Sequence, residues 1–280
     1  MDSNRVALAM LILLGGLFTA PARAETFNTC HATITSLPAV ITSQGVYCLA
    51  HDLSTALSSG NAIDIQTNNV TIDCNGYKIG GLAAGTSSLT IGIAASGRQN
   101  TTVRNCGIRG FLQGIHLESG AGNLIEDNRL DNNLAGGLFV DGDNNRVRRN
   151  AIYDTGGYPG LSQSAGMSVA ASVTDNIVSG VFATGSDPVN VGIYMYGDST
   201  EARGNVINGV LTSGAGTTVG IQVNTTGVTL RNNSIAAATV TAGSGIGGHG
   251  ATDTICIGNT VHRFATPIAN CQDGGGNSSN

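Results

Sequence analysis

The chain has 280 residues, of which 11% are charged and 4% aromatic, and its formal net charge is −5. Nucleic acid is excluded as an expected partner, because no basic stripe exists to neutralise its phosphates. The 41 Gly, the absence of Trp and the many β-branched residues disfavour long amphipathic helices and indicate short strands joined by turns.

Residues 1–24 have the pattern of a secretory signal peptide. Arg5 precedes an apolar run from Val6 to Phe18, and Ala22-Arg23-Ala24 is a small-residue cleavage site. The run is short for a membrane span, and no later segment replaces it. We therefore expect cleavage after Ala24, a secreted or periplasmic protein, and no membrane span in the mature chain.

Residues 25–60 precede the first clear repeat, and we expect them to form an N-terminal cap with a short helix over 51–59. A cap would protect the strand edge that an open stack exposes. The repeats occupy residues 61–265. Residues 266–280 are expected to form a C-terminal cap strand and a disordered tail, which the Gly-rich segment 273–280 indicates.

An apolar residue, two others, Asn, one other and a second apolar residue recur along the chain, as in Ile125-Glu-Asp-Asn128-Arg-Leu130. The pattern is centred on Asn128, Asn150, Asn176, Asn233 and Asn259, with weaker copies at Asn75 and Asn205 and with Cys106 in one Asn position. Asn at a fixed turn adopts the left-handed conformation readily, and stacked amides can bond from coil to coil. We therefore interpret the Asn row as structural.

A second pattern, Gly-apolar-any-apolar, keeps step with the first, as in Gly114-Ile-His-Leu117 and Gly192-Ile-Tyr-Met195. One thin coil cannot bury its own apolar face, so coils must stack about 4.8 Å apart and share one core. The two patterns in phase predict an all-β fold, a single-stranded right-handed parallel β-helix of about eight coils.

Two further features accompany the repeat. The position two before each Asn holds Asp73, Arg104, Glu126, Arg148, Thr174, Arg203 and Arg231. Alternating charge favours pairing between coils, and a lyase-type arginine base among these residues is the weaker interpretation. The six cysteines fit an oxidising compartment and allow 15 pairings. We favour Cys30–Cys48, Cys74–Cys106 and Cys256–Cys271, since each is local in a stacked fold.

These residues resemble the right-handed β-helix proteins, a pectate-lyase-like group that includes pectate lyases, polygalacturonases and bacterial periplasmic repeat proteins. The stretch from Gly45-Val-Tyr-Cys48 through Asn69–Gly76 to Val103-Arg-Asn-Cys106 is most similar to the uncharacterised secreted or periplasmic bacterial branch. The resemblance covers nearly the whole mature chain, but its motifs specify a fold rather than a reaction.

Stacking in register predicts columns of outward side chains on the strands that follow the repeat glycines. Two projecting insertions, Tyr153–Gly160 and the one that holds Asp187-Pro188, would make a groove beside this face. Aromatic faces beside polar groups suit sugar recognition. The predicted substrate-binding residues are Phe139, Asp143, Tyr153, Tyr194, Tyr196, Asp198, Gln222 and Asn224.

Glu118 and Asp141 occupy one column on adjacent coils, so we expect them to lie about 5 Å apart. They could form the acid/base pair of a retaining glycosidase, bind calcium as in lyase chemistry, or extend into water without a role. His116 is a candidate general base within reach of Glu118, or simply an exposed sheet residue. No cofactor is required, and calcium is the candidate metal.

Four functions remain open at this point. The chain is a polysaccharide lyase or glycoside hydrolase, a non-catalytic glycan binder, a structural envelope protein, or a periplasmic accessory in metalloenzyme maturation. The absence of a Met-rich or His-rich tract counts against the last. The columns favour a protein that interacts with polysaccharide or cell-envelope glycan, with catalysis undecided. We expect the protein to be a monomer.

Overall fold

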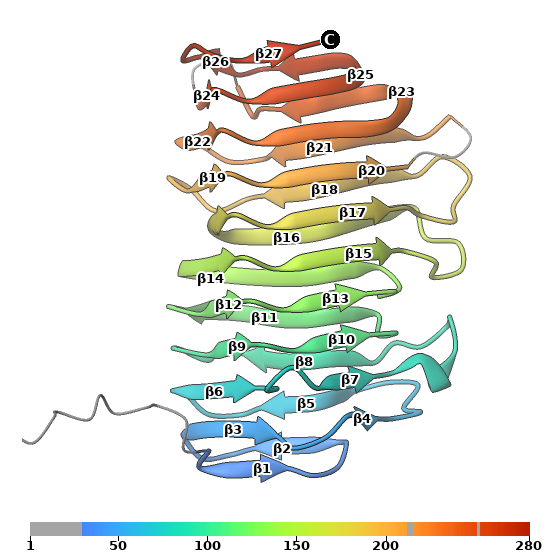
Figure 1. Ribbon diagram of the computed structural model, residues 1–280, viewed down its shortest axis with the longest axis vertical. Coiled ribbons are helices and arrows are strands. Elements are labelled where there is room, and N and C mark those ends of the chain that lie inside the picture. The colour runs from blue at the N-terminus through green and yellow to red at the C-terminus, as the bar shows by residue number, and fades with distance from the viewer. Residues whose placement is uncertain (1–29, 212–214, 251–252) are drawn as a thin grey trace, which may run out of the picture.

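The computed structural model describes residues 30–211, 215–250 and 253–280. They form a right-handed parallel solenoid of about nine turns, and the described residues contain no α-helix. The turns stack from β1 at one end to β27 at the other (Figure 1). The expected signal peptide, residues 1–24, lies outside the described residues.

Each full turn contributes one strand to each of three parallel ladders. Ladder 1 consists of β2 (Ala39–Ile41), β5 (Asn61–Ile65), β8 (Ile91–Ser96), β11 (Gln113–Ala121), β18 (Val189–Met195), β21 (Thr217–Val223) and parts of β14 (Gly136–Arg148), β16 (Gln163–Thr174), β23 (Ser234–Gly247) and β25 (Thr260–Ala269).

Ladder 2 consists of β1 (Ala32–Ile34), β3 (Gly45–Leu49), β6 (Val70–Asp73), β9 (Thr102–Arg104), β12 (Leu124–Glu126), the ends of β14 and β16, β19 (Glu201–Arg203), β22 (Val228–Arg231), β24 (Thr254–Ile257) and β26 (Gln272–Asp273). Ladder 3 consists of β4 (Leu53–Ser54), β7 (Lys78–Gly80), β10 (Gly107–Arg109), β13 (Arg129–Asp131), β15 (Ala151–Thr155), β17 (Ile177–Val181), β20 (Val206–Val210), the starts of β23 and β25, and β27 (Ser278–Ser279).

The core is a stack of like apolar residues along the solenoid axis. On ladder 1, Ile93 pairs with Ile115, which pairs with Leu138, and the column continues in the same register. These side chains are at most 1% exposed. Because side chains alternate across a strand, this register leaves the residues between them, His116 and Phe139 among them, on the outer face.

The repeat glycines are required by close packing between coils. A Cβ on Gly192 would lie 2.5 Å from the carbonyl oxygen of Gly220 and 2.6 Å from Ile207 Cγ2. An added Cβ would likewise lie 2.4 to 2.8 Å from the glycine carbonyl oxygen of the next coil at the other row positions, Gly92, Gly114, Gly137, Gly166 and Gly220. Only glycine fits at this position of the coil, which explains the recurring Gly of the Gly-apolar-any-apolar pattern.

The Asn row is a buried hydrogen-bonded ladder, as expected. Asn150 donates its backbone N–H to Asn176 Oδ1 (2.9 Å), and Asn176 donates its own to Asn205 Oδ1 (3.0 Å). The left-handed residue, however, is the one before each Asn, for example Asp175 with φ 57°. The expectation that the row Asn itself is left-handed is wrong, because its amide must point inward to bond the next coil.

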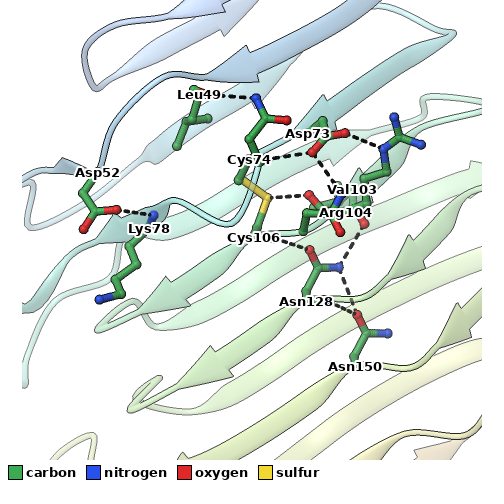
Figure 2. The surroundings of a disulfide bond; sticks show 12 residues. Leu49, Asp52, Asp73, Cys74, Lys78, Val103, Arg104, Cys106, Asn128 and Asn150 are labelled. Atoms are coloured by element: carbon green, nitrogen blue, oxygen red, sulfur yellow. Dashed lines mark hydrogen bonds and ion pairs between the residues drawn. A yellow bond between two sulfur atoms is a disulfide. The ribbon is translucent and has the colours of Figure 1, made fainter. Parts of the chain in front are cut away.

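The three expected disulfides are all formed. Cys106 occupies the Asn position, and its backbone N–H donates to Asn128 Oδ1 (3.0 Å), so that the Cys74–Cys106 bond ends the ladder (Figure 2). Asn75 is not a member of the row: unlike the row residues it is itself left-handed (φ 51°), and its side chain donates to the Leu49 carbonyl (3.0 Å).

Both ends differ from their expected structure. The described part of residues 25–60 forms β1 to β4, which pair in parallel with later strands, so the ladders begin before residue 61. Residues 51–59 contain β4 and no helix. The expected disordered tail instead forms β26 and β27, and Asn277 Oδ1 accepts from the backbone N–H of Asn259 (2.9 Å). Backbone pairing with the preceding coil orders both segments.

The charged column on ladder 2 forms ion pairs between coils. Within the column, Arg104 bonds Asp73 (2.8 Å) and Arg148 bonds Glu126 (2.8 Å). Arg231 approaches Glu201 (3.5 Å), which lies outside the column. Bonds from Asn75, Asn105 and Arg104 lower the pKa of Asp73 despite the opposing effect of its burial. The pairs support the salt-bridge interpretation of this column.

Candidate functional site

The outer column of ladder 1 has the predicted register. His116 pairs with Ala94 on one side and Phe139 on the other, and the column continues through Ser168 and Tyr194 to Gln222. Phe139 and Tyr194 are only partly buried. The sheet therefore presents apolar rings to solvent.

Four rings form a continuous row on this face. The His116 and Phe139 rings are stacked with centroids 4.6 Å apart. The Tyr196 ring lies 6.0 Å from both Phe139 and Tyr194. Since His116 and Tyr194 are three coils apart, the row extends roughly 14 Å along the solenoid axis.

Tyr196 completes the row by lying back over the preceding coil. Its hydroxyl donates to the carbonyl of Val140, two coils away (2.9 Å). The coil between carries only Ser168 and Ala170 at the two column positions, which leaves room for the ring. Burial raises the pKa of the Tyr196 phenol, and the nearby Asp141, Tyr194 and Glu118 raise it further. The Tyr196 side chain is therefore uncharged, and its hydrogen bond to Val140 holds the ring in place on this face.

His116 has a polar contact at each ring nitrogen. Nδ1 is hydrogen-bonded to Gln113 Oε1, and Nε2 lies 3.7 Å from Glu118 Oε2. Burial lowers the pKa of His116, although Glu118 partly opposes that shift. The ring is therefore neutral at pH 7, the state in which an imidazole can accept a proton.

Glu118 and Asp141 do not form a regular cross-strand pair. The β11–β14 register shifts after Leu117, so that Glu118 and Ser119 together oppose Asp141, and Ser119 takes φ 53°. This is the geometry of a β-bulge, which redirects side chains locally. Both carboxylates nevertheless raise the pKa of the Tyr196 phenol, so each lies within electrostatic range of that side chain.

Three concavities with volumes of about 380, 410 and 390 Å³ lie on and beside this face. The third lies on the same coils as the second, where ladder 1 turns into ladder 2. Gln113 lines the first and second, and Tyr196 lines the second and third. We call these three neighbouring concavities together the groove. Eight predicted residues line it: His116, Glu118, Phe139, Asp141, Asp143, Tyr194, Tyr196 and Asp198.

Asp198 lines the third concavity and is held there by the next coil. It accepts from the Thr225 hydroxyl, and from the Thr226 backbone N–H and hydroxyl, both at 3.1 Å. These bonds lower the pKa of Asp198 and keep it ionised. Asp141 and Asp143 line the same concavity, so the polar end of the groove is acidic.

The remaining three predicted residues lie outside the three concavities. Tyr153 sits on ladder 3, where the guanidinium carbon of Arg129 lies 4.5 Å from its ring centroid, so it is not part of the groove. Its placement in an insertion was wrong, because β15 extends through Thr155. Gln222 and Asn224 follow Tyr194 and Tyr196 on the next coil, where Gln222 Nε2 bonds the Val223 carbonyl (3.1 Å) and Asn224 is exposed.

Gln113 is a groove residue that the sequence columns missed. It precedes the row glycine Gly114, at a position where the neighbouring coils carry Ile91 and Gly136. The presence of a glutamine at that repeat position was the sequence feature that could have identified it as a groove residue. Among the described residues, no group of three or more His, Cys, Asp or Glu is placed to hold a metal ion.

The sequence matches the family described as "Right handed beta helix region" over residues 40–207, more than half of the chain. The chain belongs to this family. A comparison with curated proteins found no significant match. No helix within the described ranges has the length and apolar character needed to cross a membrane.

Several solved structures share the fold of this β-helix protein at low sequence identity. The pectate lyase Pel9A is 12% identical with a TM-score of 0.58, over 85% of this chain and 70% of the lyase. The mannuronan C-5 epimerase AlgE4 A-module of Azotobacter vinelandii is 13% identical with a TM-score of 0.52, over 83% and 82% of the chains. The Dettilon tailspike protein is 16% identical with a TM-score of 0.52, over 88% and 56%. At such identities the likeness establishes the fold alone.

Proposed function

We propose that this protein binds a polysaccharide along the groove of ladder 1. The observation that carries the proposal is the row of rings His116–Phe139–Tyr196–Tyr194, in a chain with no Trp and only 4% aromatic residues. Ring faces pack against the C–H faces of sugars, and the neighbouring amides and hydroxyls can bond sugar hydroxyls.

The fold is suited to this use because its parallel coils give a long, flat face. By name, two of the similar structures are a pectate lyase and a mannuronan C-5 epimerase, so the same architecture carries polysaccharide chemistry in those proteins. That likeness supports a glycan partner without identifying the sugar.

We also propose that catalysis, if the protein is an enzyme, depends on the two carboxylates within electrostatic range of Tyr196. Glu118 and Asp141 would act as the acid/base or nucleophile pair, and the neutral His116 beside Glu118 would relay a proton. No cofactor is needed for hydrolysis. Calcium is required only in the lyase alternative, where it would neutralise a substrate carboxylate.

Export is part of the proposal. Three disulfides indicate an oxidising environment. Together with the signal-like residues 1–24, they support a secreted or periplasmic protein, which we propose acts as a monomer.

Two matched tyrosine variants test the binding site. Tyr194→Ala should weaken binding to the responsive polysaccharide about tenfold, since an aromatic contact contributes roughly 1 kcal/mol or more. Tyr153→Ala removes the same ring from ladder 3 and should leave affinity unchanged. Affinity electrophoresis across a panel of neutral and uronate-containing polysaccharides would report both, and equal effects of the two variants would contradict the assignment.

A separate assay tests catalysis in the same groove. Unsaturated products and new reducing ends would be followed with calcium and with EDTA. Glu118→Gln and Asp141→Asn should abolish turnover while retaining sugar binding if the protein is an enzyme. Binding without either product would make the groove a non-catalytic glycan site.

A further inference from the structure

The groove contains acidic side chains and no basic side chain that is charged at pH 7. Five carboxylates line it: Asp64, Glu118, Asp141, Asp143 and Asp198. No Lys or Arg is among the described residues that line the three concavities. His116 is the only histidine among the described residues that line the three concavities, and burial lowers its pKa, which favours the uncharged ring.

Several basic residues of the described part of the chain lie on other faces. Arg104, Arg148 and Arg231 are paired with acids on ladder 2. Lys78 and Arg129 line a different concavity, beside the Cys74–Cys106 bond. The separation of charge follows from the register, because each repeat position occupies a single face over many coils.

A uronate chain carries one carboxylate on each sugar, so in this groove several like charges would lie within the Debye length of about 10 Å at 0.1 M salt. Their repulsion is weak for one pair in water, but several pairs together lower affinity about tenfold. The uncharged groups around the rings, Gln113, Gln163 and Ser168, instead match the hydroxyls of a neutral sugar.

We propose that the groove selects an uncharged polysaccharide and rejects uronate chains. This inference rests on the proposed function and specifies its substrate class. It separates the protein from the pectate lyase and the mannuronan epimerase that share its fold, whose named substrates are polyanions. Hydrolysis would then be the reaction to expect from the carboxylates, since lyase chemistry needs a uronate.

The test compares the affinity of the purified protein for neutral and acidic polysaccharides under identical conditions. The panel contains neutral glucans, xylans, mannans and galactans, together with polygalacturonate and alginate. Fully methyl-esterified polygalacturonate is included because it keeps the backbone and removes the charge. Every titration is run with EDTA and with calcium, at low and high salt.

At least one neutral polymer should bind, and the uronates should bind at least about tenfold more weakly at low salt, with the difference shrinking at high salt. Methyl esterification should restore the affinity for polygalacturonate, because it removes the charge of the carboxylates. The double variant Asp141→Asn/Asp143→Asn should raise uronate affinity several-fold, whereas Asp131→Asn, on ladder 3, should not.

Other outcomes separate the two claims. If a uronate binds more tightly than every neutral polymer, with or without calcium, and Tyr194→Ala weakens that binding, the groove is the site and the neutral-substrate inference is wrong. If no polymer binds, or if neither Tyr194→Ala nor Tyr196→Ala affects binding, both the proposed function and this inference fail.

Discussion

Removal of one buried ladder amide should destabilise the solenoid measurably. Asn176 is completely buried. Its Oδ1 accepts the backbone N–H of Asn150 (2.9 Å), and its Nδ2 donates to the Val147 and Thr174 carbonyls, each at 3.0 Å. Asn176→Ala leaves that N–H of Asn150 without its acceptor in a buried position.

The cost follows from the unsatisfied group and the lost volume. An orphaned buried donor costs about 1 to 3 kcal/mol, and the small cavity adds about 1 kcal/mol. We therefore expect Asn176→Ala to lower the free energy of unfolding by about 3 kcal/mol. Asn277→Ala is the matched control, because it removes the last rung of the same ladder at a partly exposed end, and it should cost less than about 1 kcal/mol.

Urea denaturation followed by far-UV circular dichroism would measure both variants. Because solenoids can unfold in segments, the slope with denaturant must be compared as well as the midpoint. Hydrogen exchange at the Asn150 amide gives a local readout. Equal and small losses for Asn176→Ala and Asn277→Ala would refute the argument that the interior amide ladder stabilises the stack.

Three further predictions concern the groove histidine, a disulfide and a row glycine. The pKa of His116, measured by NMR, should lie below the ordinary 6.5, and Glu118→Gln should lower it further by removing the opposing charge. Because the pKa of His116 is lower in the folded state, the unfolded protein binds a proton more readily, and the free energy of unfolding decreases as the pH falls below about 6.5 towards the folded pKa. The His116→Gln variant should lack this pH-dependent decrease, and equal pH dependence of the two proteins would contradict the shift. Cys74→Ala/Cys106→Ala should cost about 3 to 4 kcal/mol in urea unfolding for a bridge that spans 32 residues, and Cys74→Ala/Cys106→Asn should cost less, because Asn can extend the ladder from Asn128. Gly192→Ala should destabilise by at least about 2 kcal/mol, whereas Gly80→Ala, whose Cβ would meet nothing closer than 3.8 Å, should have little effect in thermal unfolding.

Sequence alone was sufficient for the features that repeat from coil to coil. The Gly and Asn rows predicted the register and the outer column from His116 to Gln222. The disulfide pairs were predicted because each is local in a stacked fold. The physical reason is that each coil contacts mainly its neighbours, so one repeat length translates directly into one stacking contact. The buried polar ladder follows from the same rule.

Only the tertiary structure decided the features that depend on local shape. Tyr196 lies over Ser168 and Ala170 to bond Val140, a placement that needs the space left by two small side chains. The bulge opposite Asp141 redirects Glu118, and it depends on one residue of extra length at Ser119. The extension of β15 places Tyr153 on another ladder.

The structure of the C-terminal end of the fold also could not be predicted from the sequence. Residues 273–280 have the composition of a disordered tail, yet backbone pairing with β24 and β25 and the Asn277 amide order them. A repeat pattern predicts which residues share a face. The direction of each side chain, and the docking of irregular segments, depend on neighbours from other coils, whose sizes and spacing vary independently along the chain.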